Sequence, residues 1–431
     1  MKTTIHWFRR DLRIKDNTAL YHALSQNNNV QCIFIFDENI IDELPKNDHR
    51  ISFIYDSLSK LNNELNKYGS RLKIYKGKPI DIFKKIITKY DIDYIYFNKD
   101  YEPYAISRDN QIKELLNNKI GFKTFKDHVV FEETEITKDD GKPYTIYTPY
   151  SKKWLKKFHE TEMKEYNVNP FLKNLKKNKF LNIKSRENLD LVKSNLIVYD
   201  YNTSNEIIIN YKNTRNFPSL NGTSKIGPFL RFGLISIRSL ANKSSKTDIT
   251  YLKELIWRDF FTQILFNFPN VIDKSFKTKY DNIVWENNEN FLEKWKNGKT
   301  GYPIVDAGMR ELNNTGFMHN RVRMITASFL CKHLLVDWRF GEAYFAKKLF
   351  DYELSSNNGN WQWAAGSGCD AAPYFRVFNP YTQQEKFDRD FSYVKKWVPE
   401  YNSKEYMKPL VIHKDARLKA IEHYKKYLQS I

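Results

Sequence analysis

The first 130 residues of this 431-residue chain alternate short apolar runs with amphipathic stretches, and this alternation restricts the fold more than any other feature. Residues 3–8 and 30–36 are rich in β-branched and aromatic side chains and predict buried strands. Residues 52–68 repeat apolar side chains at helical spacing and predict a helix. Further strands are expected at 71–75 and 94–97, and further helices at 19–25, 80–90 and 106–118. This order predicts an α/β domain with a doubly wound parallel sheet.

The remainder of the chain follows two other patterns. Periodicity weakens between 132 and 204, and basic residues outnumber acidic ones within 152–186, which is typical of a charged connector that crosses a surface. After 205 the spacing turns helical, most clearly in 250–268 and 318–336. We therefore expect an α/β domain over 1–131, a long linker over 132–204 and an all-α domain over 205–431.

The charge balance indicates a polyanionic partner. The chain carries 70 basic and 51 acidic residues, a formal net charge of +19. Such a surplus favours nucleic acid, although a general richness in Lys, Asn and Ile would produce a similar balance. No apolar run is long enough to predict a membrane span, and the N-terminus has no secretory h-region. Three scattered cysteines fit a reducing compartment, so we expect a cytoplasmic protein.

Several common catalytic motifs are absent from the sequence. It contains no GxSxG, HExxH, Walker A or paired CxxC pattern, and no GxGxxG follows the first predicted strand. The nine histidines do not share metal-ligand spacing on one element. Hydrolytic and metal-dependent chemistry therefore have little support, and we predict no metal site.

Two helical segments place polar side chains beside apolar ones. Glu254 and Trp257 lie three apart and share a face of the predicted helix 250–268. A carboxylate among apolar neighbours must find a partner or change its pKa, unless it simply pairs at the surface with Lys253 or Arg258. Residues 320–324 repeat the pattern with Asn320 and Met324 four apart.

Three further segments suggest ligand contacts. Arg321 and Arg323 lie close to Asn320, and an arginine beside a polar stripe of a helix could bind phosphate. Residues 222–227 (GTSKIG) combine glycine, hydroxyls and a cation before a predicted helix, an arrangement that can hold phosphate. In residues 357–363 (NNGNWQW), a helix would turn one of Trp361 and Trp363 toward the interior and leave the other for a ligand.

Eight segments, taken in chain order, resemble the DNA photolyase/cryptochrome family, most closely its class I cyclobutane pyrimidine dimer photolyases. The resemblance covers nearly the whole chain and is weakest between 132 and 205. The segments are residues 7–13 (WFRRDLR), 222–226 (GTSKI), 254–258 (ELIWR), 298–306 (GKTGYPIVD), 318–324 (MHNRVRM), 337–339 (DWR), 357–363 (NNGNWQW) and 375–380 (FRVFNP).

The resemblance implies FAD bound inside the helical domain. Asn357 is expected beside the flavin N5, and the other cofactor-binding residues follow from the same motifs. These are Tyr211, Thr223, Ser224, Lys225, Ile226, Gly227, Glu254, Arg258, Asn320, Arg323, Asp351 and Glu353.

The resemblance also implies light-driven repair of cyclobutane pyrimidine dimers, by electron transfer from excited reduced FAD to a flipped-out dimer and back. The partner is then dimer-containing DNA, and we expect a monomer without membrane or metal. Trp361, Trp338 and Trp285 match the family's electron-transfer chain, and Glu254 is expected to stabilise the charge that develops on the dimer. The residues expected to bind DNA or the dimer are Glu254, Trp257, Asn320, Arg321, Met324 and Trp363.

The sequence departs from close relatives at several positions. Phe317 replaces a Trp before the segment 318–324, Gly227 replaces a serine, and Glu353 replaces an aspartate. The first domain is expected to hold an antenna chromophore of folate or deazaflavin type. Tyr104 and Ala105 stand where folate-binding relatives carry polar and acidic residues, which leaves the identity of that chromophore open.

Two other functions remain to be weighed. A (6-4) photoproduct photolyase uses a pair of histidines where this chain has Asn320 and Met324, so its acid–base step lacks a catalyst. The alternative from another class is a cryptochrome-type blue-light receptor without repair activity. Against it, the dimer-pocket residues Glu254, Trp257 and Trp363 are present, and only about 50 residues follow the last motif, too few for a long signalling tail.

Overall fold

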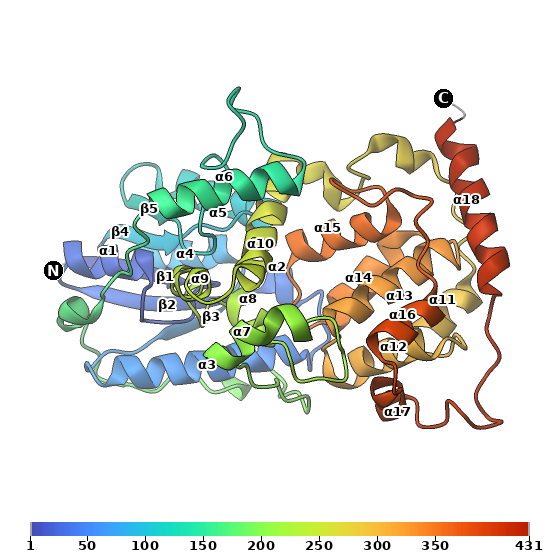
Figure 1. Cartoon of the computed structure of the whole chain (residues 1–431). Coiled ribbons are helices and arrows are strands. Elements are labelled where there is room, and N and C mark those ends of the chain that lie inside the picture. The colour runs from blue at the N-terminus through green and yellow to red at the C-terminus, as the bar shows by residue number, and fades with distance from the viewer. Residues whose placement is uncertain (1, 430–431) are drawn as a thin grey trace. The chain divides into compact units, whose positions relative to one another are not determined.

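A computed structural model describes residues 2–429 of the chain and divides them into two compact units (Figure 1). The first unit contains the described residues up to Ile136 together with Lys153–Tyr201 and Ile226–Lys246. The second contains Thr137–Lys152, Asn202–Lys225 and the described residues from Thr247 onward. The units are thus interleaved along the chain, and the three consecutive ranges inferred from the sequence stay a prediction about domain limits.

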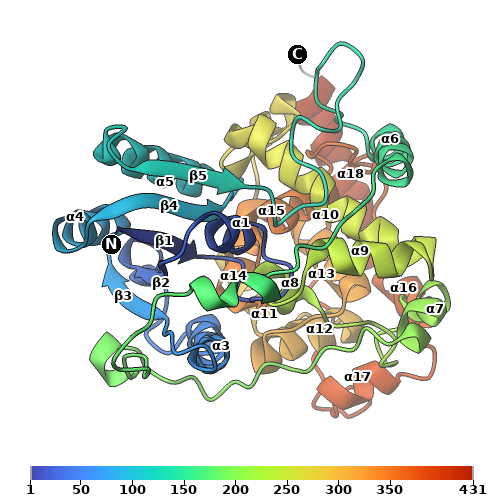
Figure 2. The ribbon, with the colours of Figure 1, turned by 90° about the vertical axis from the view of Figure 1, so that its left-hand side faces the viewer.

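The first unit is built on a five-stranded parallel sheet with the order β3-β2-β1-β4-β5 (Figure 2). The prediction of a doubly wound parallel sheet is confirmed, and the four strands expected from apolar runs are present. The fifth strand was not predicted, because it is only 5 residues long and most of its side chains are only half-buried. The strands are β1 (Thr3–Phe8), β2 (Val30–Asp37), β3 (Lys73–Gly77), β4 (Ile92–Asn98) and β5 (Gly121–Phe125).

Helices cover both faces of this sheet because alternate strand residues point to opposite sides. On one side, Phe34 and Phe36 pack with apolar residues of α1 (Thr18–Gln26) and α3 (His49–Asn66). On the other side, Ile33 and Ile35 pack with α4 (Pro79–Lys89) and α5 (Pro103–Leu116). The same unit contains α2 (Glu38–Ile41), α8 (Gly227–Arg231), α9 (Ile237–Ser245) and two short 3-10 helices at Asn169–Asn174 and Glu187–Leu189.

The stretch expected to cross the surface as a charged connector is partly buried. It contains most of α6 (Tyr147–Glu160), on which Trp154 and Phe158 lie four apart and stack with ring centroids 4.9 Å apart. Leu172 and Leu175 join the apolar core on the α1 side of the sheet. The connector stays a prediction, but a fully solvated stretch does not describe Trp154, Phe158, Leu172 and Leu175, which the many lysines around them obscured in the sequence.

The second unit is helical, as predicted. Its longest helix, α10 (Ile249–Asn267), begins where Asp248 accepts a hydrogen bond from the backbone N–H of Tyr251 and ends before Pro269. The other helices are α7 (Asn205–Thr214), α11 (Glu289–Lys296), α12 (Pro303–Thr315), α13 (Asn320–Lys332), α14 (Trp338–Lys348), α15 (Leu354–Ala365), α16 (Pro380–Phe387), α17 (Ser392–Trp397) and α18 (His413–Gln429), with 3-10 turns at Pro269–Ile272 and Thr278–Asn282.

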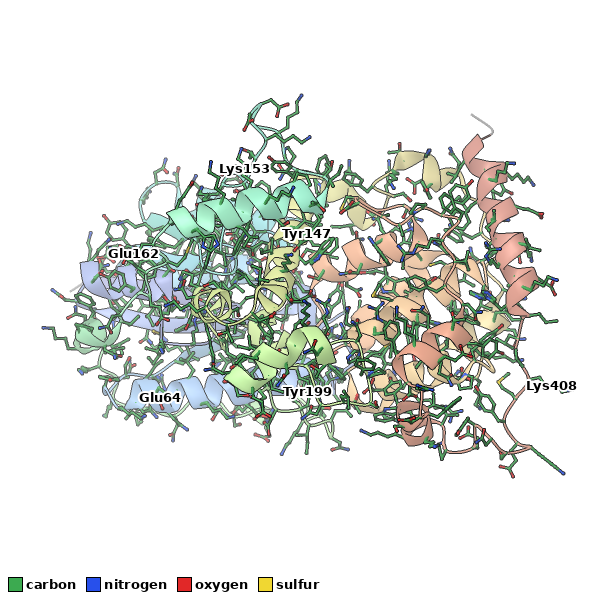
Figure 3. The ribbon with its side chains drawn as sticks, in the orientation of Figure 1. Glu64, Tyr147, Lys153, Glu162, Tyr199 and Lys408 are labelled. Atoms are coloured by element: carbon green, nitrogen blue, oxygen red, sulfur yellow. The ribbon has the colours of Figure 1, made fainter. Side chains whose placement is uncertain are left out.

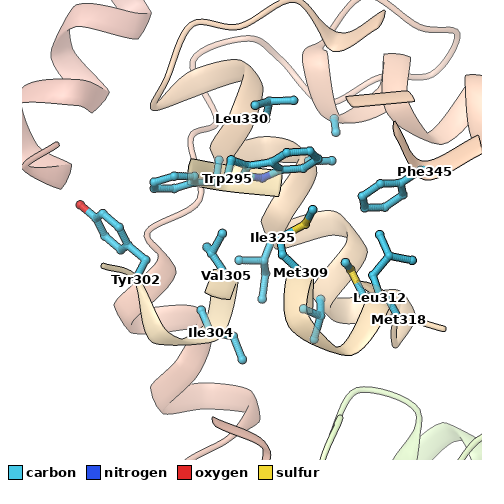
Figure 4. Packing of buried hydrophobic residues seen from close by; sticks show 14 of the residues in the cluster. Trp295, Tyr302, Ile304, Val305, Met309, Leu312, Met318, Ile325, Leu330 and Phe345 are labelled. Atoms are coloured by element: carbon cyan, nitrogen blue, oxygen red, sulfur yellow. The ribbon is translucent and has the colours of Figure 1, made fainter. Parts of the chain in front are cut away.

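The core of this unit lies among α11 to α15 (Figure 4). Trp295, Met309 and Leu330 are fully buried in it, and the indole of Trp295 donates a hydrogen bond to the carbonyl oxygen of Thr326. Gly341 of α14 lies against the ring of Trp361, and any side chain at this position would collide with that ring. Trp361 of α15 is therefore packed tightly against α14. Within residues 2–429, no helix combines the length and apolar character that crossing a membrane requires.

Candidate functional site

Most of the residues singled out by sequence lie on helices of the second unit that pack around α15. This helix contacts α10, α13 and α14, and α10 also contacts α7. Glu254 and Trp257 lie on α10, Asn320 and Met324 lie on α13, and Trp363 lies on α15. The local sequence patterns thus lie on helices that pack against one another.

Glu254 forms an ion pair with Arg215, which follows the last residue of α7. The Nη1 atom of Arg215 lies 2.6 Å from Oε1 of Glu254, and both side chains remain partly exposed. Burial raises the pKa of Glu254, whereas the Arg215 guanidinium opposes the rise. Neither Lys253 nor Arg258, the partners suggested by the sequence, is the one used. Arg215 escaped the sequence analysis because it is distant from Glu254 along the chain.

Trp257 is held in a stack of aromatic rings. Tyr147, the first residue of α6 (Figure 3), lies parallel to Trp257 with ring centroids 3.6 Å apart and an interplanar angle of 2°. The phenol of Tyr147 donates to the carbonyl oxygen of Lys253, and its backbone N–H donates to Asp370. Because Tyr147 covers one face of the partly buried Trp257 ring, at most one face is left for a ligand.

The segment 222–227 leads into α8, as predicted, but its residues fall in both units. Thr223, Ser224 and Lys225 belong to the second unit, whereas Ile226 and Gly227 belong to the first. Ser224 is buried and accepts a hydrogen bond from Tyr251, whose ring lies edge-on to Tyr211.

Lys225 combines an unusual backbone with a cation–π contact. Its φ is +51°, a conformation that non-glycine residues rarely adopt. Its ammonium group lies 5.6 Å from the centroid of Phe317. The aromatic character of that position therefore serves a contact to Lys225.

Two ion pairs involve the acidic residues expected near the flavin. Arg258 lies 2.9 Å from Glu353, and Arg323 lies 2.8 Å from Asp351. Oδ1 of Asp351 is buried and has no hydrogen-bond partner among the described residues. A buried acceptor of this kind is normally satisfied by a bound group or water.

The start of α13 presents polar and cationic side chains. Asn320 is its exposed first residue, and the preceding His319 caps the helix by accepting a hydrogen bond from the backbone N–H of Arg321. The guanidinium of Arg321 donates to Oδ1 of Asn216 at 2.6 Å and contacts the sulfur of Met324 at 3.6 Å. Burial and nearby cations lower the pKa of His319 to about 4, so its imidazole is neutral at physiological pH.

Asn357 lies buried on α15 and is oriented by Glu342 of α14. Its Nδ2 atom donates to Oε1 of Glu342 at 2.8 Å and to the Glu342 carbonyl oxygen at 3.1 Å. Burial raises the pKa of Glu342, and the hydrogen bond from Asn357 opposes that rise. Since its donor atom is committed to Glu342, Asn357 presents its side-chain oxygen elsewhere. Glu342 was missed by sequence, because no motif marks it.

The tryptophans that the sequence singled out differ in burial. Trp361 and Trp338 are buried in the same core, whereas Trp285 packs at its edge and is partly exposed. Trp363 is partly buried, so α15 turns Trp361 inward and leaves Trp363 available, as helical geometry predicted. Trp285 also contacts Tyr424 of α18, a residue that the sequence did not single out; the two rings lie edge-on with centroids 5.8 Å apart.

The donor set of this cluster fits FAD. Lys225, Ser224 and Thr223 supply a cation and hydroxyls suited to a diphosphate. The unsatisfied Asp351 oxygen and the directed Asn357 amide suit the polar edges of a flavin and its ribityl chain. Among residues 2–429, no group of three or more His, Cys, Asp or Glu side chains is arranged to hold a metal ion.

Comparison with known proteins identifies relatives over the whole length. Residues 4–168 match the family model described as DNA photolyase, and residues 251–403 match the FAD binding domain of DNA photolyase. The chain is 35% identical to the deoxyribodipyrimidine photo-lyase of Alkalihalophilus pseudofirmus, over 97% of each protein.

Solved structures show the same fold. An archaeal photolyase from Sulfolobus tokodaii with two FAD molecules superimposes with a TM-score of 0.82 at 34% identity, covering 98% of this chain and 100% of that one. A cryptochrome from Synechocystis gives the same TM-score over 98% and 99% of the two chains, but at 24% identity it shows the fold alone.

Proposed function

The chain belongs to the DNA photolyase family, and on this premise we propose that it repairs cyclobutane pyrimidine dimers in DNA with light. Its cofactor is FAD, since the helical unit contains the FAD-binding domain of that family. When bound and reduced, FAD would supply light-driven electron transfer to the dimer, and return of the electron after the cyclobutane ring opens would leave no net redox change. The protein's task is to hold both partners and to stabilise transient charge.

The observation that carries the proposal is the gathering of Glu254, Asn320 and partly exposed tryptophans on helices around α15. Two fused pyrimidines need an aromatic surface, and the partly exposed Trp363 and Trp257 would supply one. Met324 adds a polarizable contact. Asn320 and Glu254 would hydrogen-bond the polar edges of the bases and stabilise negative charge on them.

DNA binding would depend on the excess of basic residues in the chain. A net charge of +19 favours phosphate binding, and Arg321 at the start of α13 would be one contact. Extrusion of the target nucleotide is a general property of photolyases, and damaged, poorly stacked bases are the easiest to extrude. The proposed repair reaction agrees with the lack of hydrolytic motifs, because it needs no side chain to act as a nucleophile.

The residues proposed to hold FAD keep the roles expected from the motifs. Tyr211 and the segment 223–227 would bind the diphosphate, and the ion pairs of Arg258 and Arg323 would line the cofactor. Asn357 would direct its side-chain oxygen to the flavin N5–H, since Glu342 engages its amide nitrogen. Such fixed dipoles are the means by which a protein tunes flavin electronics.

Trp361, Trp338 and Trp285 are proposed to carry electrons from the surface to photoexcited oxidised flavin. Their burial supports this order, because the first two lie in the core and the third reaches the surface. These three tryptophans would restore the reduced cofactor, but they would take no part in the repair of the dimer.

A second chromophore in the first unit remains a proposal. The archaeal relative named above contains a second FAD, with the suggestion of a light-harvesting cofactor. In this chain, Tyr104 donates a hydrogen bond to Asp37 at 2.6 Å and accepts one from Asn39. The polar side chains at the carboxyl end of β2 are thus engaged with one another, and this gives no support to a folate.

Illumination of the reduced holoenzyme with a thymine-dimer oligonucleotide tests the proposal. Repair restores intact thymines, and their ultraviolet absorbance should rise only in the light. A dark sample and a sample lacking protein provide the controls. A light-dependent change in the protein without recovery of thymine would instead favour the alternative, a cryptochrome-type receptor.

A further inference from the structure

The ion pair between Arg215 and Glu254 occupies the carboxylate that the proposed function assigns to the dimer. The Nη1 to Oε1 distance of 2.6 Å is that of a strong charge-assisted hydrogen bond. Burial and, after it, the nearby Arg215 lower the pKa of Arg321, and Asn216, the next residue after Arg215, accepts a hydrogen bond from Arg321. Two guanidinium groups near each other, of which Arg215 alone is paired with Glu254, form a site that a further anion would stabilise.

A pyrimidine places two different demands on Glu254. Ring N–H groups need an acceptor, which a carboxylate supplies, whereas carbonyl oxygens need a donor, which only the protonated acid supplies. The electron transferred in the proposed reaction adds negative charge to the carbonyl-bearing base. A carboxylate would repel that charge, and a carboxylic acid would donate a hydrogen bond to it. The form of Glu254 held by Arg215 is therefore the wrong one for the electron-accepting state.

The other ionisable groups around Glu254 do not change their charge near neutral pH. Burial raises the pKa values of Tyr147 on α6, of Tyr211 on α7 and of Tyr251 on α10, so all three phenols stay neutral. The pKa of His319, next to α13, is lowered to about 4, and its imidazole is neutral as well.

The two guanidinium groups, Arg215 and Arg321, remain cations throughout this range. Among these groups, Glu254 is therefore the one whose protonation depends on the position of its partner, Arg215.

We propose that Arg215 is a positioning residue that releases Glu254 when DNA binds, and that Glu254 then takes up a proton. This inference rests on the proposed function and deepens it. A DNA phosphate competes for the partly exposed guanidinium of Arg215, while the dimer removes water from Glu254. Both changes favour the neutral acid. The proton comes from solvent and forms an O–H bond on the carboxyl group, and Arg215 keeps its charge, which the phosphate balances.

Proton uptake on binding provides the test. Holoenzyme in the dark is titrated with a short dimer-containing oligonucleotide by calorimetry, in buffers of equal pH but different ionisation enthalpy. Wild type should take up as much as about one proton more than Glu254→Gln, the matched variant without a titratable group. Over the same pH range, wild-type affinity should fall by up to about tenfold for each unit of pH increase, beyond the dependence seen in Glu254→Gln.

Variants at Arg215 separate the switch from a merely structural ion pair. In Arg215→Met, Glu254 lacks its cation before DNA arrives, so the Glu254-dependent uptake should shrink. Arg215→Lys restores a cation and should restore the uptake. Equal uptake in wild type and Glu254→Gln, or unchanged uptake in Arg215→Met, would overturn the inference.

A measurement on wild type alone guards against misfolded variants. The infrared difference spectrum between the DNA-bound and free protein should show a new carboxylic acid C=O band, shifted by deuterium. Its absence overturns the switch. The repair assay is scored on the same samples: repair without Glu254-dependent uptake refutes the switch and leaves the proposed function intact, whereas no dimer binding refutes both.

Discussion

The packing of Gly341 against Trp361 allows a prediction whose size follows from the structure. A Cβ atom at Gly341 would lie 2.6 Å from Cδ2 of Leu330 and closer still to the ring of Trp361. Non-bonded carbon atoms prefer separations of about 3.5–4.0 Å, so Gly341→Ala must displace the indole by roughly 1 Å or more. The displaced ring belongs to the proposed electron-transfer chain.

Two opposing terms set the expected loss of stability. Overpacking a core costs about 1–3 kcal/mol, and collisions with two side chains place this site at the upper end. Alanine in a helix interior gains about 1 kcal/mol over glycine. We therefore expect Gly341→Ala to lower the free energy of unfolding by about 2 kcal/mol, and to slow photoreduction of oxidised FAD while pre-reduced enzyme still repairs.

Urea unfolding, followed by the rise of flavin fluorescence, measures this loss. Trp361→Phe provides the second arm of a double-mutant cycle, because the smaller ring lacks the atoms that collide with Cβ. Gly341→Ala should cost about 1 kcal/mol less in the Trp361→Phe background than in wild type. An equal cost in both backgrounds, or a Gly341→Ala protein as stable as wild type, would refute the packing argument.

Four further predictions follow from other contacts. Glu254→Ala should reduce repair per absorbed photon by at least about tenfold, the lower end of what one hydrogen bond to a charged group is worth, and more than it reduces DNA affinity; equal losses contradict a charge-stabilising role. Trp285→Phe should slow photoreduction but spare repair by pre-reduced enzyme, and a collapse of both rules out the electron-transfer chain. Affinity for dimer-containing DNA should fall steeply as salt rises, and a flat dependence contradicts phosphate binding. Burial alone would raise the pKa of Asp127, but Arg13 and Arg238 hold it well below its usual range; unfolding measured against pH should show this stabilisation present above about pH 4 and lost as pH falls, except in Asp127→Asn.

The fold was largely predictable because its strands and helices have strong local patterns. The apolar runs at 3–8 and 30–36 form β1 and β2, and the helical spacing in 250–268 and 318–336 marks α10 and α13. Helix α6 was missed, since lysines surround Trp154 and Phe158 and lower the apparent apolar character. The interleaving of the two units was also missed, because periodicity shows what an element is but not what it packs against.

The candidate site was predictable in its residue types but not in its pairings. Spacing placed Glu254 beside Trp257 on one helix face, and motif resemblance named the other residues. The partners Arg215, Tyr147 and Glu342 come from other helices and follow no motif. Contacts of this kind depend on tertiary packing, which a single sequence does not encode at any fixed spacing.

The central claim is that light drives an electron from reduced FAD to the dimer and that the electron returns. Repeated flashes delivered to reduced holoenzyme without added reductant, in oxygen-free solution with excess dimer oligonucleotide, test it most directly. The account predicts more than one dimer repaired per flavin, with the flavin absorbance still that of the reduced form. Repair that stops after one dimer per flavin while the flavin becomes oxidised, or no repair at all, would contradict it.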